Sequence, residues 1–243
     1  MDFQGHTVLV TGGATGIGFG IAELFASAGS VVIAAGRRRE ALEKAAKKLP
    51  KLVTFACDLS KGEERQRLAA WLAKNHPALD VLVNNAGIQQ RIDIHNPDFW
   101  SQAREELSIN VEAPLHLSHL LIPLLSAQKG PCIINVSSGL AFVPMARAPV
   151  YCATKAAIHS FTQSLRQQVK ADGIEVIEII PPAVNTDLGG VGLHAKDTPV
   201  AEFIAAVKEQ LAAGKREISH GFSEMTSHGS RQELEAVFQR MNG

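Results

Sequence analysis

Gly12-Gly13-Ala14-Thr15-Gly16-Ile17-Gly18 is the stretch that decides the fold of this 243-residue chain. The β-branched and aliphatic run from His6 to Thr11 precedes it and is typical of a buried strand. Apolar residues at helical spacing, from Ile21 to Phe25, follow it. Glycines also occur in ordinary turns. Between a strand and a helix, however, they let the backbone approach a pyrophosphate closely, and the N–H groups and dipole at the helix N-terminus stabilise its negative charge. The stretch therefore predicts a phosphate-binding turn.

Beyond this turn, apolar runs alternate with helical patterns about every 25 to 30 residues. Such alternation predicts an α/β fold with a parallel sheet and helices on both faces. No linker, repeat or low-complexity tract divides residues 1–243, which favours a single domain. The further strands are expected at Val31–Ala35, Lys51–Ala56, Asp80–Val83, Cys132–Val136, Ile174–Ile180 and Arg216–Ser219.

The composition argues against charged macromolecular partners. Lys plus Arg and Asp plus Glu both number 24, so no basic field points to nucleic acid or to an anionic membrane. The three cysteines have no CxxC or zinc-like spacing, which fits buried thiols in a reducing compartment. Residues 1–5 show no basic region before an apolar core, and no run reaches about 18 apolar residues. We expect a cytoplasmic protein that acts on a small molecule.

The only tyrosine of the chain, Tyr151, stands four residues before Lys155. In a helix from about Val150 to Ala171 the two side chains share a face. The ammonium is then expected to lower the pKa of the phenol toward the range of a general acid or base. A partly buried tyrosine beside an ordinary lysine would give the same spacing. Ser138 follows an expected strand thirteen residues before the tyrosine, so a short loop can return to it.

A long helical region from Asn96 to about Gln128 contains Pro114 and Pro123, which cannot continue the hydrogen-bond ladder. A kink near Asn110 is expected. Asn110 lies between apolar neighbours and is either a satisfied core amide or a group that holds a water molecule.

The end of the second expected strand carries Gly36-Arg37-Arg38-Arg39 and no acidic residue. In a dinucleotide fold an acid there favours NAD, whereas a guanidinium suits the 2′-phosphate of NADP. The arginines could instead open a solvated helix, and Arg39 is expected to do only that. The pattern predicts NADP(H) in preference to NAD(H), selected by Arg37 and Arg38.

Together these residues resemble the short-chain dehydrogenase/reductase family over about residues 5–190. The resemblance implies a Rossmann-type doubly wound sheet with strand order 3-2-1-4-5-6-7, which uses NAD or NADP on alcohols and carbonyls. It rests on the joint order and spacing of Thr11-Gly12, Gly16-Ile17-Gly18, Asn84-Asn85-Ala86-Gly87, Asn110, Ser138, Tyr151 and Lys155.

The resemblance also implies residue roles. Asn110, Ser138, Tyr151 and Lys155 would form a catalytic tetrad with Tyr151 as the general acid or base, and no metal is required. The cofactor-binding residues would be Gly12, Thr15, Gly16, Ile17, Gly18, Arg37, Arg38, Asp58, Leu59, Asn85, Ala86, Gly87, Tyr151, Lys155, Pro181, Val184 and Thr186. The expected partner is a small-molecule carbonyl or alcohol, and the protein is expected to be a homo-oligomer, either a dimer or a tetramer.

The chain departs from the family pattern at three places. Thr15 replaces the basic residue of related NADP enzymes, and Pro181-Pro182 replaces the usual Pro-Gly. A substrate lid is expected at about 187–213, and residues 214–243 form an atypical tail that looks like a minor branch including the DltE-like oxidoreductases. The expected pocket residues fall in this region, so the sequence predicts a reaction class and not a substrate.

Three further side chains are candidates for the substrate pocket. Met145 and Phe142 lie between the serine and the tyrosine and could line an apolar pocket or simply pack. His194 lies in the expected lid.

The main alternative function is a regulatory protein that senses dinucleotide without turnover. Such a sensor needs the glycine turn but not Ser138, Tyr151 and Lys155 together. A serine hydrolase is a weaker alternative, because Ser138 lacks a GxSxG elbow.

Overall fold

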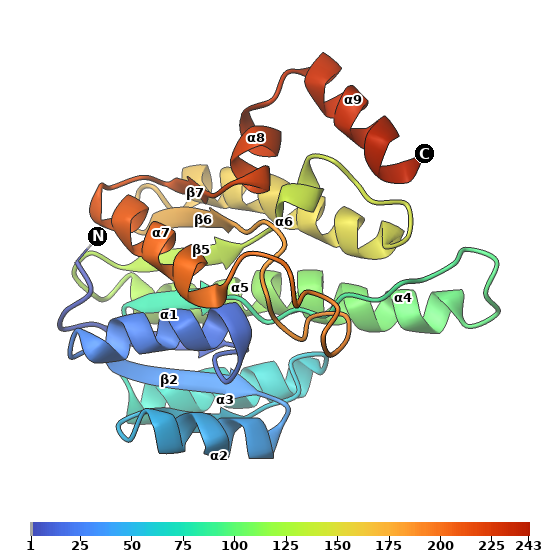
Figure 1. Ribbon diagram of the computed structural model, residues 1–243. Coiled ribbons are helices and arrows are strands. Elements are labelled where there is room, and N and C mark those ends of the chain that lie inside the picture. Colours follow the sequence, from blue (N-terminus) through green and yellow to red (C-terminus); the bar gives the residue numbers. More distant parts are fainter. Residues whose placement is uncertain (1) are drawn as a thin grey trace.

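In the computed structural model, which describes residues 2–243, seven strands form one parallel sheet (Figure 1). The strand order β3-β2-β1-β4-β5-β6-β7 confirms the predicted order and the α/β class. Each strand ends close to its predicted position, while β3 begins two residues later than expected. The strands are β1 Thr7–Thr11, β2 Val31–Gly36, β3 Val53–Ala56, β4 Val81–Asn84, β5 Cys132–Val136, β6 Glu175–Ile180 and β7 Glu217–Ser219.

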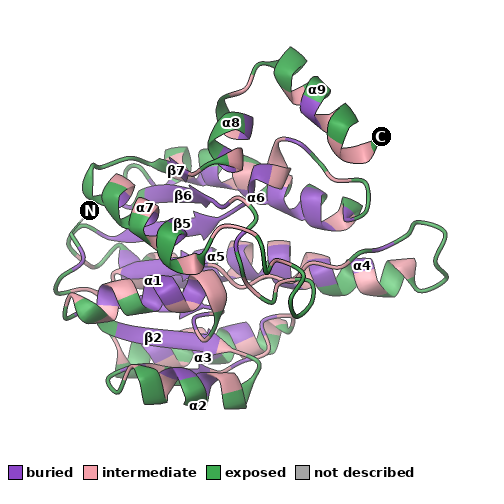
Figure 2. Ribbon diagram, viewed as in Figure 1, coloured by how far each residue is buried: buried purple, intermediate pink, exposed green. Residues whose placement is uncertain are grey.

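Helices cover both faces of the sheet, and each face has its own apolar core. Val8 and Val10 of β1 face one core and Leu9 faces the other, because side chains alternate along a strand. Figure 2 shows the strands buried and the outer helices exposed on their far sides. The first core receives α1 Gly16–Ser27, α2 Arg39–Lys48 and α7 Val200–Ala212, and the second receives α3 Gly62–Asn75, α5 Ala113–Leu125 and α6 Pro149–Gln168.

The long helical region is broken where the sequence predicts a kink. Helix α4, Phe99–Leu107, runs into a π-helical turn, η1, at Ser108–Glu112, before α5 begins. The backbone N–H of Ala113 donates to the carbonyl of Ser108, five residues earlier. Pro114 has no N–H, so the carbonyl of Asn110 cannot receive its α-helical hydrogen bond.

The C-terminal tail forms two helices. Helix α8 spans Phe222–His228 and helix α9 spans Arg231–Asn242. A capping box between Ser230 and Glu233 starts α9. Figure 1 shows α9 standing apart from the two helical layers, above the loop that precedes α6. No helix within residues 2–243 is long and apolar enough to cross a membrane.

Candidate active site

The glycine turn lies against the loop that follows β4, and the contact leaves no room for side chains. A methyl group on Gly18 would lie 2.4 Å from both the carbonyl oxygen of Gly12 and Nδ2 of Asn85. Gly12 has a φ of 65° and a Cβ there would lie 3.0 Å from the Cα of Ala86. Thr11 fastens the two loops, because its Oγ1 accepts hydrogen bonds from the N–H groups of Asn85 (3.0 Å) and Ala86 (3.1 Å). Glycine is therefore required here by both conformation and space.

The N-terminus of α1 lies beside this turn, and no side chain caps its backbone N–H groups. The N-cap residue, Thr15, makes no capping hydrogen bond to the first turn of the helix. The 12-residue helix thus presents backbone N–H groups and the positive end of its dipole. Gly16, with a φ of 56°, faces Thr186, one of the residues expected to bind the cofactor. A cradle of this shape and polarity fits the pyrophosphate of a dinucleotide.

The two arginines after β2 diverge. Arg38 donates from Nη2 to Oγ1 of Thr15 (3.1 Å) and lines a second cavity of about 700 Å³ beside the glycine turn. Arg37 points the other way, with Nη1 3.4 Å from Oε1 of Glu105, and both groups are exposed. Asp58 lies near Arg37; burial acts to raise the pKa of its carboxyl, but hydrogen bonds from Ser60 and the neighbouring cations outweigh it and lower the pKa.

A cavity of about 1000 Å³ runs from the glycine turn to the C-terminal tail. Most of the predicted residues line it, and five do not, namely Arg37, Arg38, Asp58, Leu59 and Asn110. The predicted residues along the cavity are Gly12, Thr15, Gly16, Ile17, Gly18, Asn85, Ala86, Gly87, Ser138, Tyr151, Lys155, Pro181, Val184 and Thr186.

Ser138, Tyr151 and Lys155 meet in the middle of this cavity. Lys155 donates from Nζ to the carbonyl of Val136 (2.8 Å), and Nζ lies 5.6 Å from the centre of the tyrosine ring. Tyr151 is 5% exposed and within hydrogen-bonding reach of the Ser138 hydroxyl. Helix α6 places the tyrosine and the lysine on one face, as the i, i+4 spacing predicts.

The expected lowering of the tyrosine pKa is wrong for this arrangement. Burial raises the pKa of Tyr151, and the hydrogen bond with Ser138 opposes it only in part. Burial also lowers the pKa of Lys155 to about 8, against the attraction of Glu106 and Glu178. Desolvation disfavours both charged forms, and the sequence pattern contains no information on how deeply the pair is buried.

Asn110 proves to be a satisfied core amide whose side chain braces the loop after β4. Its Oδ1 accepts from the N–H of Ile88 (2.9 Å), and its Nδ2 donates to the carbonyl of Ile88 (2.8 Å) and to Thr154 (3.1 Å). A Cβ on Gly87 would lie 3.3 Å from Oδ1 of Asn110 and 3.7 Å from Nζ of Lys155. The side chain of Asn110 therefore lies near the lysine, and its backbone carbonyl receives no hydrogen bond from residue 114, which is a proline.

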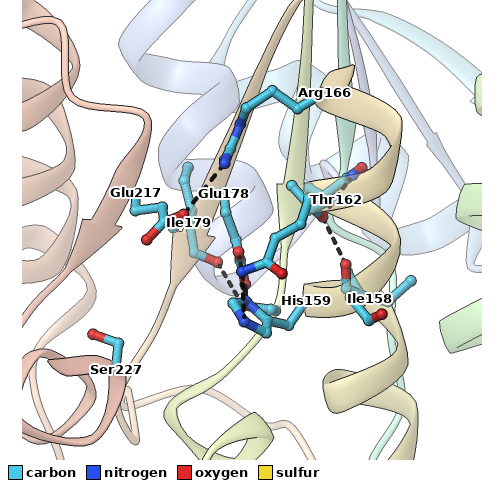
Figure 3. Close-up of polar contacts among 12 residues, drawn as sticks. Ile158, His159, Thr162, Arg166, Glu178, Ile179, Glu217 and Ser227 are labelled. Atoms are coloured by element: carbon cyan, nitrogen blue, oxygen red, sulfur yellow. Dashed lines mark hydrogen bonds and ion pairs between the residues drawn. The ribbon is translucent and has the colours of Figure 1, made fainter. Parts of the chain in front are cut away.

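A buried carboxylate that the sequence analysis missed, Glu178 of β6, lies behind Lys155. Ser137 donates from Oγ to Oε1 of Glu178 (2.5 Å), and Nδ1 of His159 lies 2.9 Å from Oε2. Figure 3 shows His159 and Glu178 pointing toward each other from α6 and β6. Ser137 directly precedes the catalytic candidate Ser138, and His159 lies one helical turn after the candidate Lys155. A glutamate inside the apolar strand Glu175–Ile180 was the available signal.

A second missed carboxylate, Glu106, lies in α4 one turn before Asn110. It is fully buried; Oε1 accepts from the N–H of Gln90 (3.0 Å), and Oε2 has no hydrogen-bond partner within the described residues. Burial raises its pKa to about 7, and the charge of Lys155 opposes that shift. Two buried acids thus flank the lysine from different elements.

Two of the three side chains considered for the substrate pocket line the cavity. Met145 lines it, whereas Phe142 packs on His159 with ring centres 4.6 Å apart. His194 lines the cavity too, with Nδ1 2.7 Å from Oδ2 of Asp197 and a buried Nε2 that has no partner within residues 2–243. Phe222 and Met241 of the tail, which no sequence motif marks, also face the cavity.

Known proteins share this sequence and this fold. Residues 6–194 match the family model described as short chain dehydrogenase. The chain is 39% identical to the uncharacterized oxidoreductase DltE of Bacillus subtilis (strain 168), with 100% of the chain and 98% of the relative covered. A short chain dehydrogenase from Burkholderia cenocepacia J2315, solved in complex with NADP, is 26% identical with a TM-score of 0.82 over 99% of each chain. A Burkholderia phymatum short chain dehydrogenase/reductase, solved with NAD, shares the fold at 19% identity, with a TM-score of 0.85 over 98% of this chain and 96% of that one.

The fold and the site together define a nicotinamide-dependent oxidoreductase of the short-chain dehydrogenase/reductase family, to which this chain belongs. Within that family it is a member of the DltE-like branch.

Proposed function

We propose that the protein is an NADP-preferring carbonyl reductase or alcohol dehydrogenase, with Tyr151 as the proton donor. The observation that carries the proposal is the meeting of Ser138, Tyr151 and Lys155 on a cavity that continues to the glycine turn. When bound in that cradle, the reduced nicotinamide would supply the hydride. The chain itself has to hold the substrate oxygen and give it a proton.

Ser138 and Tyr151 are suited to these two tasks. Negative charge develops on the carbonyl oxygen during reduction, and two hydroxyl donors aimed at one place stabilise it there. The raised pKa of Tyr151 keeps its proton in place until the nascent alkoxide, a far stronger base, takes it.

Lys155 and Asn110 would return the proton to the tyrosine. With a pKa of about 8, Lys155 is mostly protonated at neutral pH and can release a proton without a large barrier. The carbonyl of Asn110 would hold a water molecule behind the ammonium group, which links the lysine to solvent.

The preference for NADP rests on charge at the end of β2. Arg37 and Arg38 stand there without an acidic residue, and Arg38 already contacts the glycine turn through Thr15. A guanidinium at this place binds a 2′-phosphate through charge-assisted hydrogen bonds. The Burkholderia cenocepacia relative, at 26% identity, was solved with NADP.

The central experiment measures oxidation of NADPH and NADH by the wild type and by Tyr151→Phe against acetone, acetophenone and benzophenone. We expect NADPH consumption that falls by at least about a hundredfold in the variant, since only the proton donor is lost. NADPH binding, followed by its fluorescence, should stay within about twofold in the variant. Unchanged turnover in Tyr151→Phe would contradict the mechanism. Absence of turnover with all three ketones, while NADPH still binds, would favour the dinucleotide-sensing alternative.

A second experiment tests the cofactor preference by measuring dissociation constants for NADPH and NADH. Arg37→Ala and Arg38→Ala should each weaken NADPH by about tenfold or more relative to NADH, since a hydrogen bond to a charged group is removed. Lys47→Ala is the matched control, because Lys47 is an exposed cation in the last turn of α2 and does not line the second cavity. Equal losses for both cofactors would remove the 2′-phosphate role.

A further inference from the structure

The end of the cavity that lies away from the glycine turn has a mostly apolar wall, which also contains Arg147, whose Nε donates to Sδ of Met145 (2.9 Å). Leu140, Met145 and Leu188 pack around Tyr151 and line the cavity beside it. Phe222, the first residue of α8, and Met241, in the last turn of α9, complete this wall. Two residues from the last 22 positions of the chain therefore share one cavity with Ser138 and Tyr151.

Helix α8 is docked tightly on the loop that follows the catalytic serine. A Cβ on Gly139 would lie 3.1 Å from the Cα of Ser223, so the backbones touch. Thr226 donates from Oγ1 to the carbonyl of Gly139 (3.3 Å), and both Ser223 and Thr226 are fully buried. Phe222 is thus held in place next to Ser138.

Helix α9 is held in a different way, at its last turn. The side chain of Asn242 accepts at Oδ1 from the N–H of Ala146 (2.6 Å) and donates from Nδ2 to the carbonyl of Pro144 (3.0 Å). Both partners belong to the loop between Ser138 and Tyr151. Within α9 itself only Val237 is buried among the described residues, and the outer face is exposed (Figure 2). Asn242 therefore clamps a lightly packed helix onto the catalytic loop.

Met241 precedes the clamp directly, so the clamp decides where its side chain lies. Methionine is unbranched, polarisable and adaptable, and it accommodates apolar groups of different shape. A ligand group that reaches it is removed from water between Met241, Phe222 and the apolar side chains around Tyr151.

We propose that α9 forms part of the substrate site, in which Met241 contacts the apolar group carried by the reacting carbon and Asn242 positions Met241. The substrate class that fits is a ketone or secondary alcohol with an aryl or branched alkyl substituent. The proposal rests on the proposed function, because the reacting carbon is placed by Ser138 and Tyr151. It assigns to the C-terminal helix a role in choosing the substrate, separate from binding the cofactor.

The test compares benzophenone with acetone, which has no group long enough to reach the tail. In Met241→Ala and Asn242→Ala the ratio of kcat/KM for benzophenone to that for acetone should fall about tenfold, because pocket contacts worth one or two methylene groups are lost. Met241→Leu should restore most of the ratio. Arg240→Ala, an exposed neighbour in the same helix, is the control and should leave the ratio unchanged. The dissociation constant for NADPH should stay constant in all four variants.

Calorimetric titration of benzophenone into the NADP⁺-loaded protein separates this proposal from the proposed function. Weaker binding by Met241→Ala, with no turnover even in the wild type, would support the tail contact while contradicting the reductase. Turnover with the same ratio and the same affinity in Met241→Ala and the wild type would overturn the tail contact alone. Failure of the wild type to bind benzophenone would overturn the substrate class.

Discussion

Residues 2–87, the cofactor part, and residues 88–243, the catalytic part, build their halves of the cavity by different means. The cofactor part uses backbone: glycines at 12, 16 and 18 let the chain approach the loop after β4, and the donors are peptide N–H groups. The catalytic part uses buried charge: Glu106, Lys155 and Glu178 are each at most 5% exposed. The first half therefore depends on shape and the second on ionisation in a desolvated environment. A substitution in the first half should act through sterics, and one in the second half should act through pH and charge.

The largest effect should follow from adding one methyl group in the cofactor part. Gly18→Ala would place a Cβ 2.4 Å from a backbone carbonyl that cannot rotate away. We expect NADPH binding to be lost, together with about 1–3 kcal/mol of stability from overpacking. Fluorescence titration with NADPH and urea unfolding measure the two effects.

Gly62→Ala is the matched control for that prediction. Gly62 begins α3, and a Cβ there would meet only Arg65 at an ordinary 3.6 Å. This variant should bind NADPH like the wild type. Normal binding by Gly18→Ala would remove the steric account of the cofactor part.

Next in size is the loss of a buried acid from the catalytic part. Glu178→Ala leaves Ser137 and His159 without their shared acceptor, a carboxylate that is fully buried. Breaking such a buried pair should cost about 3 kcal/mol in the free energy of unfolding. Glu175→Ala, at the exposed start of the same strand, should cost well under about 1 kcal/mol, because its pair with Arg216 is solvated. Equal costs for the two variants would break the comparison between the parts.

Glu106→Gln should change how stability depends on pH. Burial raises the pKa of Glu106 from 4.5 to about 7, so between these values the unfolded chain is ionised while the folded protein is not. The contribution of Glu106 to the free energy of unfolding of the wild type therefore falls as pH rises from 4.5 to 7 and stays constant above pH 7. The variant should be more stable than the wild type at pH 8, by about 3 kcal/mol, and the gain should vanish toward pH 4.5. Urea unfolding at several pH values checks this; a gain independent of pH would show a packing effect instead.

The smallest effect should come from His159, which is partly exposed. The hydrogen bond to Glu178 raises its pKa above 6.5 against the effect of burial. Because the folded-state pKa is the higher one, the stabilisation is complete below pH 6.5 and is lost as pH rises through the raised pKa. The stability difference between the wild type and His159→Gln should therefore be largest at acid pH. A difference that grows toward alkaline pH would contradict the assignment of the charge to His159.

Much of the cofactor part could be predicted from sequence because its determinants are local. The glycine turn, the strand before it and the helix after it are contiguous, and their periodicities report burial directly. The Tyr151 and Lys155 pair is local too, since i, i+4 spacing places both on one face of α6. The π turn near Asn110 follows from Pro114, four residues away.

The remainder of the site depends on residues that are distant in sequence. Glu178 accepts a hydrogen bond from Ser137, which is 41 positions away in the sequence, and Asn242 accepts one from Ala146, which is 96 positions away. No local sequence pattern predicts either contact. The raised pKa of Tyr151 likewise depends on how much protein covers the phenol, which only packing decides.

The sequence by itself therefore predicted the glycine turn and the placement of Tyr151 and Lys155 on one helix face, because residue spacing reports short-range geometry directly. Through its resemblance to the family it also predicted the strand order. Only the tertiary structure decided which carboxylates are buried behind Lys155, that Phe142 packs on His159, and that the last helix reaches the cavity. Burial and desolvation are sums over all neighbours in space, so they become known only when distant segments are brought together.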